Sequence, residues 1–287
     1  MTNILDSLVV VLRTAIFISL LQSAGVALFI SLFNRHLTIS KTSIYLLGKI
    51  SALSGATFIL IRYLLEPIRL TGSLSGFLDF SLHEFLITSN FGFAQFFKLL
   101  GTIIVGASFL QSSRLSRMAG IIGACFIAAS FSLMGHVAAS EQQWVLAILL
   151  TIHLLLAAFW FGALIPLHLV CSKEKLIAAK LVKHFSKIAS FTVPLIPCAG
   201  LGIALILLPS LTSLKTPYGI LLISKIIGFS ALMGIAALNK FKLGPSLSTE
   251  NHHSISIFKR AISLEILLII IVLCITATMT TLYSPEI

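Results

Sequence analysis

Long apolar runs separated by short polar segments dominate the hydrophobic pattern of this chain. A transmembrane helix needs about 20 mostly apolar residues, and eight stretches meet that requirement. Because lipid offers no partner to a free backbone N–H or C=O group, each stretch is predicted to be an α-helix. The predicted spans are residues 6–33, 43–65, 91–111, 116–139, 143–170, 185–209, 217–240 and 259–282.

The composition agrees with a chain that is mostly embedded in lipid. Hydrophobic residues make up 57% of the 287 residues and charged residues only 10%, whereas soluble domains carry roughly 25% charged residues. We therefore predict an all-α, polytopic membrane helix bundle that forms one transmembrane domain over residues 1–287. The net charge of +11 then reflects loops beside the membrane, so the expected partner is membrane lipid and not nucleic acid.

The basic residues alternate between the two sides of the predicted bundle. They follow the first, third, fifth and seventh spans, and the other loops carry most of the acids. Because Lys and Arg collect in cytoplasmic loops, both termini are predicted to lie on the outer, periplasmic side. The residues of the basic loops are Arg35, Lys41, Arg114, Arg117, Lys173, Lys175, Lys180, Lys183, Lys187, Lys240, Lys242, Lys259 and Arg260.

The longest outer connection, residues 66–90, has apolar residues at roughly helical spacing. This pattern predicts a short amphipathic or re-entrant helix that lies over the outer face. Such a helix would place Asp79, His83 and Glu84 near the outer mouth of the bundle. An interfacial helix whose polar face is simply solvated is the alternative for these three residues.

Two histidines, His136 and His153, stand on consecutive predicted spans. An ionisable side chain inside the bilayer is costly, and therefore marks a candidate functional site. His136 is predicted near the outer interface. His153 lies about ten residues into its span, which places it near the middle of the bilayer at roughly 1.5 Å per residue.

These side chains are typical ligands of copper. Imidazole binds copper, zinc and iron, and thioether selects Cu(I), so we predict a copper site from His136, His153, Met134 and His83. On a regular helix Met134 and His136 point about 200° apart, and they can share an ion only if the helix unwinds at Gly135. Alternatively, His153 donates one hydrogen bond to a neighbouring helix and binds no metal.

Several charged residues are also predicted inside the bilayer, and their charges affect whether a copper ion could bind there. Arg13, Lys98 and Lys225 fall at a depth close to that of His153, where they would repel a copper cation. They either hold carboxylates or haem propionates, or donate to backbone carbonyls. Glu265 is the clear intramembrane acid, and its level in the bilayer matches Asn239 better than Lys225.

Several motifs resemble those of the CopD/PcoD family of copper-resistance proteins, and their order along the chain agrees with that family as well. The resemblance extends from about residue 90 to the end of the chain. The N-terminal third is compatible in its number of spans. The motifs are SLMGHVAAS, HLLLAAFWFGALIPL, HFSKIASFTV, TPYGILLISKIIGFSALMGIAALNKFKLGPSL and ISLEILLIIIVLCITATM.

This resemblance implies an eight-helix protein of the inner membrane that transports or handles copper in copper homeostasis or resistance. It also implies a periplasmic CopC-type copper-binding partner. The chain departs from the family pattern because it lacks a Met-rich or His-rich outer segment. The family's motif positions correspond here to Gly135, His136, His153, Ala157, Trp160, Gly162, Tyr218, Gly219, Leu222, Lys225 and Asn239.

Three functions are compatible with this sequence. The first is a copper transporter, which is not expected to be an enzyme and has no nucleotide-binding motif for ATP-driven pumping. The second is a membrane redox protein that binds haem b with His136 and His153 as axial ligands. The third is a membrane subunit that anchors a partner. The sequence leaves the oligomeric state open.

Overall fold

The computed structural model describes residues 2–208, 210–247 and 252–285. Within these ranges the chain is helical and contains no strand. Eight helical spans in the described residues are long and apolar enough to cross a membrane. The predicted all-α bundle of eight spans is therefore confirmed.

Seven of the spans are each built on one long helix, and the sixth consists of two shorter helices, α8 and α9. The long helices are α1 Thr2–Phe33, α2 Lys41–Thr71, α4 Asn90–Ser108, α5 Arg114–Ser130, α7 Gln143–Lys173, α10 Pro217–Leu238 and α12 His252–Leu282; the two shorter ones are α8 Lys175–Thr192 and α9 Leu195–Leu207. The connections contain α3 Phe80–Thr88, α6 His136–Ala139 and α11 Gly244–Ser246. They also contain the short helices η1 Asn34–His36, η2 Leu74–Leu78, η3 Phe131–Leu133, η4 Leu211–Lys215 and η5 Asn239–Leu243, the last of which is a π-helix.

The sixth span differs from the prediction in where it begins. The span was expected at residues 185–209, but helical structure already starts at Lys175, and the lysines assigned to a loop lie on α8. The span is interrupted at Val193 and Pro194 before α9 starts. Proline has no N–H and clashes with the preceding helical turn, so Pro194 accounts for this break.

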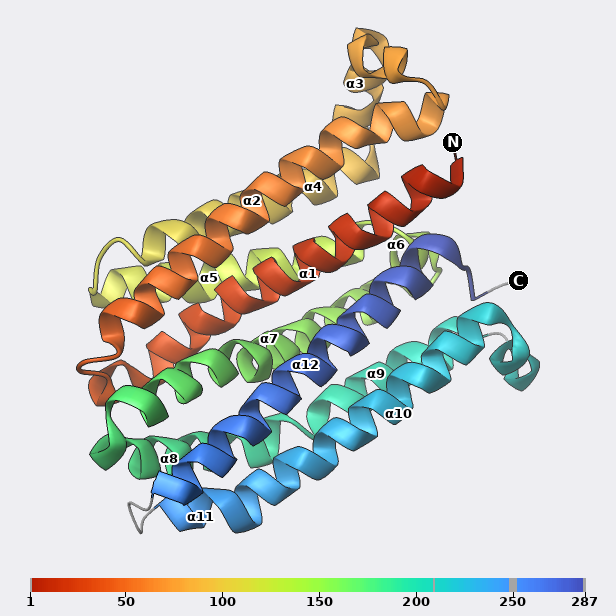
Figure 1. The fold of residues 1–287 in the computed structure, drawn as a ribbon. Coiled ribbons are helices and arrows are strands. Elements are labelled where there is room, and N and C mark those ends of the chain that lie inside the picture. The colour runs from red at the N-terminus through yellow and green to blue at the C-terminus, as the bar shows by residue number, and fades with distance from the viewer. Residues whose placement is uncertain (1, 209, 248–251, 286–287) are drawn as a thin grey trace.

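The helices α1 and α7 form the centre of the bundle (Figure 1). Helix α1 packs against α2, α5, α7 and α12, and α7 packs in addition against α8 and α9. On one side α4 pairs with α5, and on the other α10 pairs with α12. The two groups of helices that flank the centre are thus joined mainly through α1 and α7.

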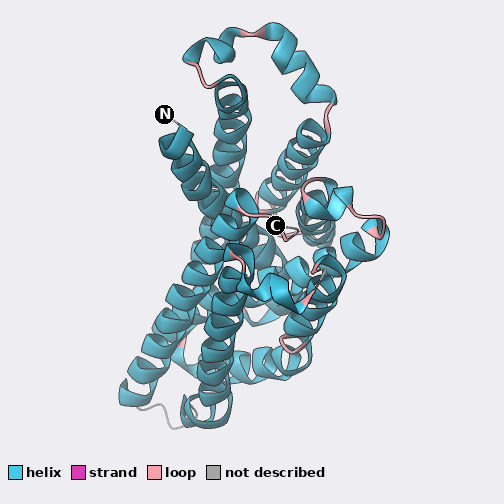
Figure 2. Cartoon of the chain, turned by 90° about the vertical axis from the view of Figure 1, so that its right-hand side faces the viewer, coloured by secondary structure: helices cyan, strands magenta, loops and turns pink. Residues whose placement is uncertain are grey.

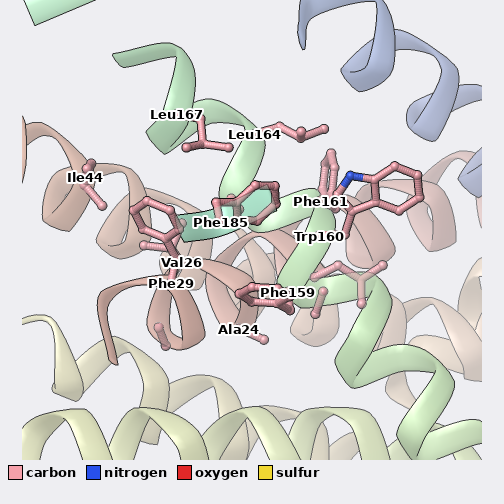
Figure 3. Close-up of a cluster of buried hydrophobic side chains, with 14 of the residues drawn as sticks. Ala24, Val26, Phe29, Ile44, Phe159, Trp160, Phe161, Leu164, Leu167 and Phe185 are labelled. Carbon is pink, nitrogen blue, oxygen red and sulfur yellow. The ribbon is translucent and has the colours of Figure 1, made fainter. Parts of the chain in front are cut away.

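The crossing of α1 and α7 is a contact between two backbones at Gly25 and Gly162. A Cβ atom built on Gly25 would lie 2.7 Å from the Cα atom of Gly162. Small residues allow membrane helices to approach this closely. Buried aromatic side chains of α1, α7 and α8 pack beside the crossing, among them Phe29, Phe159 and Phe185 (Figure 3).

The first turn of α1 and the last turn of α12 lie at the same end of the bundle, together with α3 and α6 (Figure 1). Figure 2 shows that the connection from α2 to α4, which contains η2 and α3, arches beyond the other helices at this end. We call it the outer end, because the loop charges predict that it faces the periplasm. The opposite end, which carries the basic loops, is called the inner end.

At the inner end, Glu174 connects α7 to the loop between α1 and α2. Its carboxylate accepts hydrogen bonds from the hydroxyl and backbone N–H of Thr38 and, at 2.6 Å, from the backbone N–H of Ser40. Burial opposes ionisation of this carboxyl group, but the hydrogen bonds from Thr38 and Ser40 outweigh it and lower the pKa of Glu174. The connection therefore depends on the ionised carboxylate.

We predict that Glu174→Ala lowers the free energy of unfolding by about 1.5–3 kcal/mol, the range for hydrogen bonds to charged groups. Because folding lowers the pKa, the stabilisation is present above the unfolded pKa and is lost as the pH falls through the folded value. Thermal unfolding of the purified protein in detergent at pH 7 and at pH 4 measures both effects. The matched control is Glu141→Ala, which removes an exposed acid. Equal melting temperatures for the two variants at pH 7 would contradict this role of Glu174.

Candidate copper pathway

His153 is the eleventh residue of α7, about 15 Å along the helix from its outer end at 1.5 Å per residue. Its Nδ1 atom lies 2.9 Å from the carbonyl oxygen of Ile196 in α9. A carbonyl can only accept a hydrogen bond, so Nδ1 carries the proton and the lone pair of the neutral ring is on Nε2. Metal-binding histidines have the same arrangement, with one nitrogen held by a second residue and the other available to the metal.

The imidazole of His153 has a close neighbour in α9 and lies within the electrostatic field of a lysine. A Cβ atom on Gly200 would lie 3.4 Å from Cε1 of His153, so this position of α9 packs closely on the ring. The charge of Lys225, in α10, acts on the same ring. Among the described residues no carboxylate pairs with Lys225. A cation at His153 would therefore encounter a positive neighbour.

The second part of the candidate site is the segment Met134–Gly135–His136, at the outer end. The fourth span was predicted to be helical to residue 139, but α5 ends at Ser130 and Met134 is extended. Gly135 has φ 72°, in a region of backbone conformation that favours glycine. His136 then begins α6 and is half-buried. The chain thus unwinds at Gly135, which is the condition for Met134 and His136 to reach the same ion.

Met134 already has a polar neighbour. The Nζ atom of Lys98, in α4, lies 3.6 Å from the Met134 sulfur, and it also lies 4.7 Å from the centre of the Phe131 ring. The Lys98 residue is only 4% exposed. Its ammonium group is therefore held by a thioether and an aromatic face, two weak partners for a buried charge.

Arg13 donates to a backbone carbonyl, which is one of the two roles predicted for the buried cations. Its Nη1 atom donates a hydrogen bond of 3.1 Å to the carbonyl oxygen of Thr280 in α12. The nearby Arg62 instead forms an ion pair with Glu66, which also binds Arg69. Within the described ranges, neither Arg13 nor Lys98 has an acidic partner.

His83 lies on a different part of the outer end. Its Nε2 atom is 2.9 Å from the carbonyl oxygen of Phe77, and its ring is near Tyr63. Helix α3, which carries His83, packs on α4, whereas α6 packs on α7 and η3. In the described part of the chain, no three His, Cys, Asp or Glu side chains gather closely enough to hold a metal ion.

The motif residues Trp160 and Asn239 lie together with the intramembrane acid Glu265 at the inner half of the bundle. Glu265 is 3% exposed, and its Oε1 atom accepts a hydrogen bond of 2.6 Å from Nδ2 of Asn239. Trp160 makes an edge contact with Phe229 of α10 at 6.0 Å between ring centres. All three line a cavity of about 210 Å³ between α7, α8, α10 and α12. The sequence did not predict this cavity, because its walls come from four separate segments.

Comparison with known families gives two matches that together cover most of the chain. Residues 4–143 match the model described as copper resistance protein D-like, N-terminal domain, and residues 179–279 match copper resistance protein D. Neither description refers to haem. No curated protein and no solved structure gave a significant match.

The first match extends the resemblance into the N-terminal third of the chain, from α1 to the start of α7. Residues 144–178, which include His153 and Trp160, lie between the two matched regions. The order of the two matches and the eight membrane-spanning helices agree with one family. The chain is a multi-pass inner-membrane protein and belongs to the CopD/PcoD family of copper-resistance proteins.

Proposed function

We propose that this copper-resistance protein carries copper ions across the inner membrane and that His153 is a ligand midway along the path. The observation that carries the proposal is the hydrogen bond from His153 Nδ1 to Ile196. It fixes the ring and leaves Nε2 for a metal, inside a membrane helix where an unused histidine is costly. A purely structural histidine would make the same bond, so only the effect of replacing the imidazole separates the two.

The outer entrance is Met134 and His136, which stand on the unwound segment around Gly135. Thioether and imidazole together form a ligand set suited to copper. The segment lies at the end of the bundle that the loop charges predict to face the periplasm. A periplasmic copper-binding protein of the CopC type would exchange copper at this end.

The basic residues keep copper binding weak enough for release. The ammonium group of Lys98 is 3.6 Å from the Met134 sulfur, so a copper ion on this sulfur must displace it. The positive charge of Lys225 opposes a cation at His153 through its electrostatic field alone. Conduction requires ion sites that are favourable enough to enter and weak enough to leave.

The copper content and the absorbance spectrum of purified protein test this function. After incubation with copper and removal of the excess, wild-type protein should retain copper in a near-stoichiometric ratio to protein. It should show no Soret band. His136→Ala and Met134→Leu should each lower the copper content, because each removes one ligand of the entrance. The control is His184→Ala, which removes an exposed histidine at the inner end. A Soret band that disappears in His136→Ala would instead identify a haem protein.

A further inference from the structure

A basic hollow and an apolar cavity adjoin at the inner end of the bundle, and the proposed copper ligands Met134, His136 and His153 line neither of them. The lining of the hollow includes Lys180, Lys183 and Lys187 of α8 together with Lys240, which follows α10. The apolar cavity, of about 210 Å³, lies deeper between α7, α8, α10 and α12. The two linings have Ser186, Ser190 and Lys240 in common.

The positive charge of the hollow is not neutralised within the described protein. Lys180, Lys183 and Lys187 are spaced three and four residues apart on α8, so they share one helix face, and all three are exposed. Lys240 is exposed as well, and its Nζ atom lies 4.9 Å from the centre of the Phe241 ring. None of the four forms an ion pair with an acid in the described residues. The hollow is therefore complementary to an anion from outside the chain.

The adjoining cavity is suited to hydrocarbon. Its walls include Trp160, Leu164, Phe185, Val193 and Phe258. The polar pair Glu265 and Asn239 also lies in the wall, where one side chain donates to the other. An apolar cavity favours an apolar occupant, since water would have few partners there. Helix α8 packs on α7 and α11, and α10 packs mainly on α12, so the cavity separates α8 from α10.

We propose that this composite site binds one anionic phospholipid of the inner leaflet. The phosphate group lies among the lysines of α8 and Lys240, and one acyl chain enters the cavity between α8 and α10 past Ser186 and Ser190. Basic pockets between membrane helices at the cytoplasmic face bind anionic lipid head groups in this way. The long lysine side chains can pack their apolar stems along the helix while their ammonium groups reach the phosphate.

Native mass spectrometry of the full chain in detergent, titrated with dioleoyl phosphatidylglycerol or dioleoyl phosphatidylcholine, tests the proposal. Wild-type protein should bind the first phosphatidylglycerol molecule at least tenfold more tightly than phosphatidylcholine. The double variant Lys183→Gln/Lys187→Gln should lose at least tenfold in affinity, because each lysine near an anionic lipid contributes about fivefold. The control Lys173→Gln/Lys242→Gln removes the same charge at the inner end, outside the site, and should bind as wild type does.

Cavity-filling variants test the place of the acyl chain. Ala189→Phe on α8 and Ala237→Phe on α10 fill the cavity from opposite walls, and each should weaken phosphatidylglycerol binding by at least tenfold. Ala237 is exposed in the structure, so its variant keeps the test available if Ala189→Phe misfolds. Three results would each overturn the proposal: equal affinity for the two lipids, equal losses in the site and control double variants, or displacement of the lipid by millimolar inorganic phosphate.

Discussion

Replacing His153 with alanine is expected to reduce copper transport at least about tenfold, because the variant removes the proposed ligand in the middle of the membrane. Substitutions that only disturb the support of a metal ligand already cost 10- to 100-fold. Folding should change little, since a hydrogen bond between membrane helices contributes about 0.6 kcal/mol on average. The measurement is copper accumulation in cells that express equal amounts of each variant.

Two further variants separate the ligand from the hydrogen bond. His153→Gln keeps a side-chain N–H that can donate to Ile196, but it removes the imidazole, so it should be as inactive as His153→Ala. His168→Ala removes a half-buried histidine from the inner part of the same helix, and it should transport copper as wild type does. Normal transport by His153→Gln would assign His153 a structural role.

The largest effect on folding is expected from Gly162→Ala. A Cβ atom at this position would overlap the backbone of Gly25 and Val26 in α1, where no flexible side chain can move aside. Overpacking costs 1–3 kcal/mol even in cores that can adjust, so we expect a loss of about 3 kcal/mol or more. The yield of monodisperse protein and its melting temperature in detergent measure this loss.

Gly234→Ala in α10 is the matched control, because a Cβ atom there has no atom within 4 Å. Alanine favours a helix over glycine by up to about 1 kcal/mol, so this variant should melt at the wild-type temperature or slightly above. If both alanine variants had the stability of wild type, the close crossing of α1 and α7 would be wrong.

The sequence predicted the fold class and the number of spans because both follow from the length of the apolar runs. It misplaced the start of the sixth span because Lys180, Lys183 and Lys187 reduce the local hydropathy and resemble a loop. In the structure these lysines occupy one face of α8, and Leu181, Val182 and Phe185 are buried on the other. An amphipathic helix beside the membrane thus combines a loop-like composition with helical structure.

The sequence supplied the residue types of the candidate site but not their contacts. Histidine and methionine in apolar runs made His136, His153 and Met134 candidates, and the presence of Gly135 indicated where the helix could unwind. The acceptors of His153 and Arg13 are backbone carbonyls of Ile196 and Thr280, and a carbonyl oxygen has no signature in the sequence. For the same reason the hydrogen bond from Lys98 to Met134 became evident only from the packing of α4 on η3.

Copper flux through the purified protein in proteoliposomes tests directly whether copper crosses the membrane by way of His153. Vesicles with wild-type protein, with His153→Gln or with no protein are given the same copper gradient in each direction, and internal copper is followed over time. We expect protein-dependent flux for wild type and the rate of empty vesicles for His153→Gln. Equal flux for the wild-type and variant vesicles would contradict a path through His153.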